Sequence, residues 1–325
     1  EVWAPTNCRL RAPAHPPSAR GMDASAPPQH DRTGLAAAFG AYVIWGFLPL
    51  YLILVRSVPA FEFVGWRIIW TLPLCLLIVL ARKQWPDLRA ALRNRRTVAW
   101  LAASATLIAI NWVVYVWAIQ NGQVYAASLG YYINPLVNVL LGTLLLGEKL
   151  TRAQWVAVGL AAIGVSLLAA GALTTLWISL TLALSFGTYG LIRKQLDVGA
   201  VPGLTIESTL LLLPSLGVAW YFAQTQGSSF AVSTELSLSI MAGGLLTAFP
   251  LLLFAIAARK LPYSTLGFIQ FLAPSIVFIL GLTVFGEELK PAQAACFACI
   301  WAAAVIFMWD MVKRSRSQSR IKAAS

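Results

Sequence analysis

The sequence offers few side chains that could recognise a small molecule, and most of them lie inside long apolar stretches. Four recur at spacings of three and four residues: Ser128, Tyr131, Asn134 and Asn138. This spacing places them on one face of a helix, where they either line a cavity or join neighbouring helices. We favour a cavity, because Pro135 lies in the same stretch and polar side chains beside a kinked helix exceed what packing needs.

Aromatic and polar residues of other apolar stretches can complete the same cavity. The additional candidates are Trp45, Arg67, Asn111, Thr247 and Gln270. A lining rich in aromatic rings and sparing in polar groups suits an amphipathic organic molecule better than a bare ion. We therefore predict that these residues line a substrate cavity together with Tyr131, Asn134 and Asn138.

Charged residues are rare in the apolar stretches, and they could bind substrate or carry protons. Arg67 is the sole cation predicted within a span, where it costs several kcal/mol unless it is paired or hydrated. Glu62 lies five residues earlier, a spacing at which two helical side chains do not meet well, so it is a poor partner for Arg67. Arg67 therefore either binds a carboxylate of the substrate or holds a backbone carbonyl. Proton coupling would have to use Glu62, Glu207 or Asp310, all predicted near span ends. Alternatively, the Glu207 side chain extends to the membrane interface and has no role in transport. A facilitator or exchanger that uses no proton is equally compatible with the sequence.

The residue sets of known enzyme and metal sites are missing from the sequence. The two histidines, His15 and His30, lie in the N-terminal tail, which excludes a histidine-dependent hydrolase or zinc site within the membrane. No phosphate-binding loop is present to support ATP hydrolysis. Cys296 and Cys299 form a CxxC pair, but they lie in an apolar stretch without an acidic or histidine partner. We therefore predict no enzymatic activity, no cofactor and no metal.

The elements that must position these residues are membrane-spanning helices. The chain is 59% hydrophobic and 11% charged, whereas soluble domains carry about 25% charged residues. Apolar runs of about 20 residues, the length that crosses the hydrocarbon of a bilayer, follow one another along the chain. We predict an all-α polytopic membrane protein with ten transmembrane helices, at residues 34–55, 62–81, 98–119, 124–146, 153–170, 173–192, 203–223, 236–258, 262–285 and 291–311.

The second half of the chain repeats the first. At a shift of 139 residues, Pro135 falls on Pro274, and Gly147 with Glu148 falls on Gly286 with Glu287. Five spans in each half is an odd number, so the halves enter the membrane from opposite sides and form two inverted five-helix repeats. We expect Pro135 and Pro274 to act as hinges or kinks near the midplane, since each proline frees a backbone carbonyl. The two glutamates are expected to cap a helix or hold a loop.

Positive residues orient the predicted spans. With the N-terminus inside, all but three of the 24 Lys and Arg residues lie on the cytoplasmic side, and the exceptions are Arg56, Arg67 and Lys290. Both termini are then cytoplasmic. The net charge of +12 is explained by this topology and by attraction to anionic lipid, so it does not indicate binding to nucleic acid. Met22 could serve as a start, which would make residues 1–21 an upstream extension. The predicted divisions are a disordered tail (1–33), two repeats (34–170 and 171–312) and a basic tail (313–325).

These residues resemble the pattern of the drug/metabolite transporter superfamily with two EamA-type domains, in its RarD branch. The most specific matching stretch is SLGYYINPL, from Ser128 to Leu136, and further matches are Glu62 with Arg67 and Trp70, Asn111 with Trp112, Tyr189 with Arg193, Glu207, Thr247 with Pro250, and Gln270 with Pro274. Two features depart from the pattern: the N-terminal tail, and Phe271 where a tyrosine is expected. The resemblance implies export across an inner membrane by alternating access, without fixing the substrate.

We therefore expect a secondary transporter that exports small organic metabolites or drug-like compounds. Its expected partners are a small-molecule substrate and the lipid bilayer, with a proton or a counter-substrate as open alternatives, and the oligomeric state is not predicted. The alternative is a receptor or assembly scaffold that transports nothing. Kinked midplane helices and inverted halves argue against that alternative, because signalling needs neither.

Overall fold

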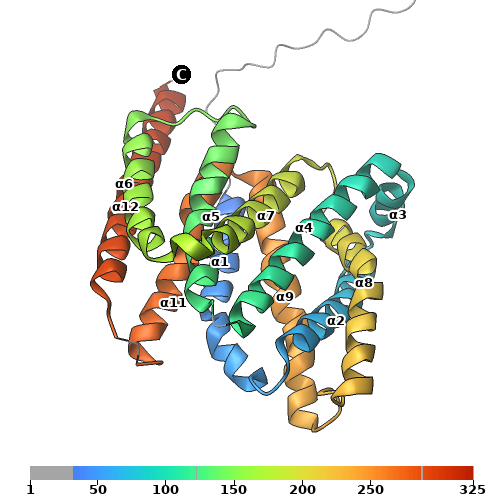
Figure 1. The fold of residues 1–325 in the computed structure, drawn as a ribbon. Coiled ribbons are helices and arrows are strands. Elements are labelled where there is room, and N and C mark those ends of the chain that lie inside the picture. Colours follow the sequence, from blue (N-terminus) through green and yellow to red (C-terminus); the bar gives the residue numbers. More distant parts are fainter. Residues whose placement is uncertain (1–31, 122, 287, 325) are drawn as a thin grey trace, which may run out of the picture.

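The computed structural model describes residues 32–121, 123–286 and 288–324, and these form a bundle of helices (Figure 1). No strand occurs in these ranges. The predicted tail lies almost wholly outside the described residues, as do Met22 and Glu287. The first half of the chain forms α1 (Arg32–Leu52), the short helix η1 (Ile53–Val55), α2 (Ala60–Ala81), α3 (Trp85–Arg93), α4 (Arg95–Gln120), α5 (Val124–Leu144) and α6 (Arg152–Ala169). The second half forms η2 (Ala170–Thr175), α7 (Leu176–Gln195), α8 (Ala200–Thr225), α9 (Thr234–Lys260), α10 (Tyr263–Gln270), α11 (Leu272–Thr283) and α12 (Pro291–Ala324).

Nine helical segments of the described chain are long and apolar enough to cross a membrane, and their ends agree with nine of the predicted spans within three residues. The remaining predicted span is α5, which is 21 residues long. Large apolar side chains on several of the helices are exposed, as surfaces in contact with lipid would be; Leu213 on α8 is 79% exposed.

The short helix α3 was not predicted, since it lies between the predicted spans 62–81 and 98–119. Its sequence carries Pro86 and Asp87 in the first turn and Arg93 in the last turn, which suits the helix dipole at each end. Leu88 and Ala91 are buried where α3 packs against α8 and α4. The helix is too short for its apolar periodicity to stand out in the sequence.

The two halves of the chain interleave. The most extensive helix contacts all join the first half to the second, namely α6 with α12, α5 with α7 and α10, α2 with α8 and α9, α1 with α9 and α11, and α4 with α7. Figure 1 shows α6 and α12 together at one edge of the bundle, and α2 and α8 at the other. Neither half therefore builds a core by packing on itself.

The arginine at position 193 lies within a helix, which corrects its predicted place in a cytoplasmic loop. Helix α7 continues to Gln195, so Arg193 and Lys194 occupy its last turn, and Arg193 is 1% exposed. Arg67 is consequently not the sole cation within a span. Lys194 donates hydrogen bonds to the carbonyls of Ala258 (3.0 Å) and Leu261 (2.5 Å) at the end of α9. Two backbone carbonyls at the end of α9 thus hold the Lys194 ammonium, and Lys194 is half-buried.

The two prolines predicted as hinges differ in their effect on the helix. The helix that contains Pro274 is divided at Phe271 into α10 and α11, whereas α5 runs through Pro135 as one helix. A Cβ atom on Gly267 of α10 would lie 2.7 Å from the Pro135 carbonyl oxygen, so the two backbones touch at this point. Pro135 therefore lies where the backbones of α5 and α10 meet, whereas Pro274 lies beyond the break, in α11.

Glu148 ties the end of α5 to the start of α10. Its carboxylate accepts hydrogen bonds from the backbone N–H of Tyr263 (2.5 Å), the N–H of Ser264 (2.9 Å) and the Ser264 hydroxyl (2.7 Å). The turn before it places Gly147 at a φ of 66°, a conformation that favours glycine. The expected structural role of Glu148 agrees with this geometry, but the capped helix belongs to the other half of the chain and is not the next helix, α6.

Replacing Glu148 with alanine is expected to lower the free energy of unfolding by roughly 2–3 kcal/mol, because three donors at the start of α10 lose a charged acceptor. Thermal unfolding of the purified protein in detergent measures this change. The matched control is Glu288→Ala, which removes an exposed carboxylate. Equal destabilisation in the two variants would contradict the capping role of Glu148.

Candidate functional site

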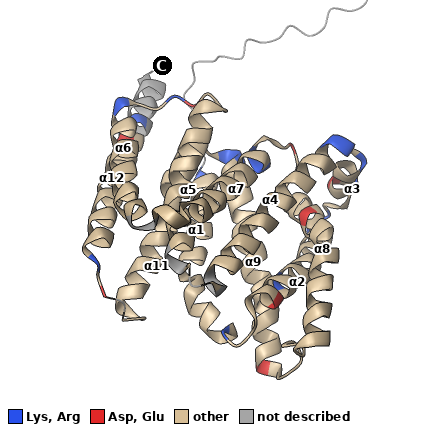
Figure 2. Ribbon diagram, viewed as in Figure 1, with Lys and Arg blue, Asp and Glu red and all other residues tan. Residues whose placement is uncertain are grey.

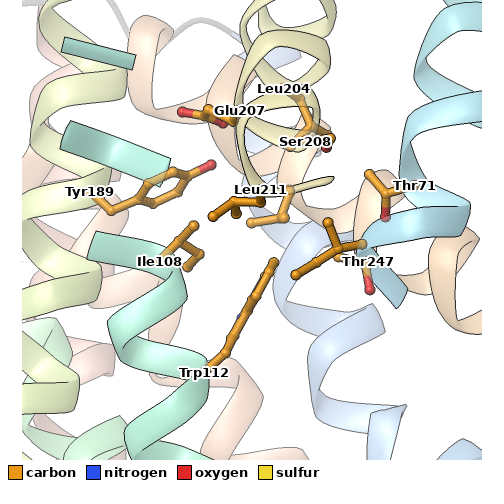
Figure 3. Close-up of a pocket in the computed structure, with 11 residues that line it drawn as sticks. Thr71, Ile108, Trp112, Tyr189, Leu204, Glu207, Ser208, Leu211 and Thr247 are labelled. Atoms are coloured by element: carbon orange, nitrogen blue, oxygen red, sulfur yellow. The ribbon is translucent and has the colours of Figure 1, made fainter. Parts of the chain in front are cut away.

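A narrow cleft with a free volume of about 10 Å³, room for about one water molecule, lies between α2, α4, α7, α8 and α9. Its lining is mostly apolar, with polar groups at a few places, as is typical of sites for small organic molecules. Figure 3 shows Glu207 and Ser208 from α8 at one end of the cleft, with Thr247 and Trp112 toward the other. Of the predicted cavity residues, Thr247 lines this cleft directly, and Glu207 joins it from the predicted acids.

Arg67 lies next to the same cleft and is held by Thr247. The Arg67 Nε–H donates to Thr247 Oγ1 at 2.7 Å, and the Thr247 hydroxyl donates to the Gly243 carbonyl at 2.7 Å. The guanidinium carbon also lies 5.4 Å from the ring centre of Trp112 and 5.6 Å from that of Phe63, so cation–π attraction adds to the hydrogen bond. A second, smaller cleft, which is closed to water in this structure, borders both Arg67 and Thr247.

Arg67 has no carboxylate partner in the part of the chain that the structure describes. Glu62, its nearest acid in the sequence, faces a different set of groups and forms no ion pair with it. A guanidinium at membrane depth without a counter-charge is costly unless an anion or water approaches it. The geometry therefore leaves Arg67 able to bind an anionic group.

The close contact of α2 with α9 positions Arg67 against Thr247. Gly244 allows the two backbones to approach, since a Cβ atom there would lie 2.7 Å from the backbone carbon of Trp70. The Thr71 hydroxyl completes the contact by donating to the Gly244 carbonyl at 3.2 Å. Small residues at such crossings are a common way for membrane helices to pack closely.

A second group of predicted residues lies outside both clefts and joins α1, α5 and α10. Gln270 Oε1 accepts hydrogen bonds from Asn138 Nδ2 (2.7 Å) and from the Tyr42 hydroxyl (3.4 Å). All three side chains are buried. Because their bonds run between helices, this group stabilises the contact of the two halves.

The remaining residues of the α5 stripe have different surroundings. Asn134 is buried, and its Oδ1 atom has no hydrogen-bond partner. Tyr131 is 40% exposed, and its ring contacts that of Tyr115 at a centroid distance of 5.8 Å. The stripe therefore does not line either cleft, although its residues share a helix face.

Two further cavity candidates are packed between helices. Asn111 Nδ2 donates to the Leu182 carbonyl (2.9 Å) and to Ser185 Oγ (3.0 Å), and so joins α4 to α7. Trp45 contacts the rings of Phe186 and Phe254 at 5.7 and 5.9 Å in an aromatic core cluster. In this structure neither residue lines either cleft.

The three predicted acids differ in how completely they are bonded. Glu62 accepts from Trp66 Nε1 (3.1 Å) and from the N–H (2.8 Å) and hydroxyl (2.6 Å) of Ser229, which holds the loop between α8 and α9. Asp310 accepts from the Thr151 hydroxyl at 3.0 Å, at the start of α6. Only Glu207 among the three lines the larger cleft.

The surroundings of Glu207 include residues that the sequence analysis did not assign to a site. Ser104 Oγ donates to Glu207 Oε1 at 2.5 Å, and Arg193 Nη1 lies 3.8 Å from the same oxygen. Ser104 carried no signal in the sequence. Arg193 could have been found by continuing the apolar run of α7 to its end, where a buried cation would need an acid.

Comparison with known proteins relates the chain to membrane transporters. Residues 32–170 match the model of the EamA-like transporter family. A protein of Streptomyces exfoliatus named RarD is 45% identical and aligns with 90% of this chain and 94% of its own. An uncharacterized transporter of Vibrio cholerae is 39% identical, with 91% of this chain and 99% of that protein aligned. A protein of known crystal structure has the same fold, with a TM-score of 0.67, 20% identity, and coverage of 84% of this chain and 96% of that one.

The substitution Gly244→Ala tests the helix contact that positions Arg67. The added methyl group meets the backbone of Trp70, so α2 must move away from α9, and we expect a loss of roughly 1–3 kcal/mol in stability. Thermal unfolding in detergent measures it. Gly217→Ala in α8 is the matched control, since its Cβ would meet nothing within 4 Å and the change should be neutral or stabilising. A stable Gly244→Ala protein would show that the close approach is not required.

Proposed function

The chain belongs to the EamA-like transporter family, in the branch of proteins named RarD, and from this premise we propose that it is a secondary transporter of small organic anions. The protein is a multi-pass membrane protein and a transporter. The proposal concerns the substrate and the direction of transport. The protein exports metabolites or drug-like compounds that combine an apolar body with an anionic group.

The observation that carries this proposal is the position of Arg67. Its guanidinium borders the smaller cleft, has as its hydrogen-bond acceptor the neutral hydroxyl of Thr247, which lines both clefts, and faces two aromatic rings. A carboxylate, sulfonate or similar group would supply the missing counter-charge through charge-assisted hydrogen bonds. Trp112 and the apolar lining of the larger cleft would cover the rest of the molecule once movement of the repeats has widened the cleft.

The proposed mechanism is alternating access by two inverted five-helix repeats, at residues 34–170 and 171–312. Two observations support it. With its 21 residues, α5 is long enough to be a tenth span, which gives five in each half. The helix contacts also follow a repeated scheme, because α1 contacts α9 and α11 as α7 contacts α4 and α5. Rocking of one repeat against the other would expose the cleft to each side in turn.

The proposed location is an inner membrane, with both termini in the cytoplasm. The charge distribution supports this orientation, since Figure 2 shows most Lys and Arg residues of the described chain at one end of the bundle. The opposite end carries few positive residues, among them Arg56 and Lys290. Short positive segments stay on the cytoplasmic side during membrane insertion.

Binding of matched acids and amides tests the proposed anion specificity. The thermal stability of the purified protein is measured with benzoate against benzamide, and with benzenesulfonate against benzenesulfonamide. We expect the two anions to stabilise the protein and the neutral partners to bind at least roughly tenfold more weakly, because a hydrogen bond to a charged group contributes about 1.5–3 kcal/mol.

The Arg67→Gln variant should lose the preference for the anion, whereas the control Arg82→Gln, at an exposed arginine, should keep it. Equal stabilisation by acid and amide in the wild-type protein would contradict the proposal. So would an unchanged anion preference in Arg67→Gln.

A further inference from the structure

Glu207 and Arg193 form a buried charge pair at one end of the larger cleft. Glu207 is 2% exposed and Arg193 is 1% exposed. Their closest atoms, Glu207 Oε1 and Arg193 Nη1, lie 3.8 Å apart, which is too far for a strong hydrogen bond. Ser104 Oγ donates to Oε1 at 2.5 Å, while Glu207 Oε2 has no partner. The pair is thus held together by charge more than by direct hydrogen bonds.

This pair is a poor device for stability alone. Arg193 makes one hydrogen bond, from Nη2 to the Ala200 carbonyl at 3.1 Å, and its Nε and Nη1 atoms have no acceptor. A buried ion pair offsets its desolvation cost only with good geometry and satisfied hydrogen bonds. Apolar side chains of similar volume would stabilise the same place at least as well. The charges therefore call for a functional explanation.

The pair joins three helices around the end of the cleft. Arg193 comes from α7, Glu207 from α8 and Ser104 from α4. Arg193 lies two residues from the end of α7, so its side chain is close to the end of the bundle where α3 and the basic segments lie (Figure 2). A change in the charge of Glu207 would loosen this junction and leave Arg193 free to turn toward water.

We propose that Glu207 is the proton-carrying residue of the transporter, and that its ion pair with Arg193 closes the α4, α7 and α8 end of the cleft. This inference rests on the proposed transport function. In the ionised state, Glu207 attracts Arg193 and accepts from Ser104, and the three helices stay together. One proton from the aqueous phase binds the free Oε2 atom and converts the carboxylate to a neutral acid. The attraction is then lost, and this end of the cleft opens.

Loss of the same proton to the opposite aqueous phase, after the repeats have rocked, restores the carboxylate and the pair. One cycle thus moves one proton across the membrane and consumes nothing. Glu207 and Thr247 line the same cleft, and Thr247 accepts the Arg67 hydrogen bond, so a substrate anion beside Arg67 and the proton on Glu207 would lie along one path. This arrangement allows the two to be exchanged in alternate half-cycles.

The other groups that face Glu207 do not change charge in the relevant range. They are Arg193 and Tyr189 from α7, Cys75 from α2 and the Ser104 hydroxyl from α4. Arginine, tyrosine and cysteine side chains keep their protons from acidic to neutral pH. Glu207 is therefore the member of this group whose charge a proton gradient can change.

The other two predicted proton sites are less suited to this role. Both carboxylate oxygens of Glu62 accept hydrogen bonds, from Trp66 and from the loop that holds Ser229. Asp310 lies beside the start of α6, where it accepts from Thr151. Neither acid lines the larger cleft. Glu62 consequently provides a matched control for a carboxylate that is buried without carrying protons.

Accessibility of the cleft at different pH values tests the proposal without any substrate. All four cysteines are replaced with alanine, and Ser208→Cys is introduced as a reporter beside Glu207. The protein is placed in nanodiscs, where both faces are open to reagent, and labelled with a membrane-impermeant maleimide. Its rate is divided by that of the exposed reporter Arg82→Cys, which corrects for the reactivity of the thiol itself.

We expect the normalised rate to rise at least about tenfold from mildly alkaline to mildly acidic pH. Glu207→Gln should give the fast rate at every pH, whereas Glu62→Gln should keep the pH dependence of the parent. Arg193→Gln serves as the second variant if Glu207→Gln does not fold, and it should also remove the pH dependence. A parent rate that is independent of pH would overturn the proposal, as would an unchanged profile in Glu207→Gln.

Transport in proteoliposomes separates this proposal from the proposed substrate. The probe is benzenesulfonate, which stays ionised and does not cross lipid in response to a pH gradient. If the wild-type protein does not transport it, the anion proposal fails, while the labelling result stands on its own. If the wild-type protein transports it, Glu207→Gln should keep benzenesulfonate exchange and lose the effect of the pH gradient. Gradient-driven transport that is equal in the variant and the wild type would overturn the role of Glu207.

Discussion

The antiparallel contact of α5 with α10 is the interaction on which the rest of the structure depends. Backbones touch where Gly267 meets Pro135, and the Glu148 carboxylate caps α10 from the other half of the chain. Between these points, Asn138 donates to Gln270. Because the halves otherwise interleave without cores of their own, these contacts hold in register the helices that surround the clefts. Pro135, which the sequence analysis assigned to a hinge, lies at this contact.

The charges inside the bundle are handled in two different ways. Glu62 and Lys194 are bonded to donors or carbonyls at helix and loop ends, so they connect elements and have little freedom to react. Arg67 and the pair of Glu207 with Arg193 are incompletely bonded and lie along the larger cleft. In an apolar setting, incomplete bonding raises the energy of the resting structure. Such groups are consistent with sites where an anion or a proton arrives during function.

The sequence predicted the spans well because the thickness of a bilayer sets the length of each apolar run. It also found Glu148, Arg67, Thr247 and Glu207, since charged and polar residues stand out in such runs. It could not identify their partners, because Ser104 and Ser229 become relevant only through tertiary contacts. Arg193 was misplaced because the rule for positive loops assigns every cation near a helix end to water, and its buried acid is invisible in sequence. The polar face of α5 was recognised correctly as a face, but helical spacing does not tell which neighbour covers it, and Gln270 covers Asn138.

The interleaving of the halves also has a consequence for the synthesis of the chain. Arg67 reaches the membrane 180 residues before Thr247, the residue that accepts its hydrogen bond. Glu62 precedes Ser229, which donates to it, by 167 residues. At a synthesis rate of about 5–20 residues per second, both charges wait for roughly 10 to 40 s without their partners. During that time the first five spans must be accommodated by lipid, water or the insertion machinery, and the two charges meet their partners only as α8 and α9 arrive.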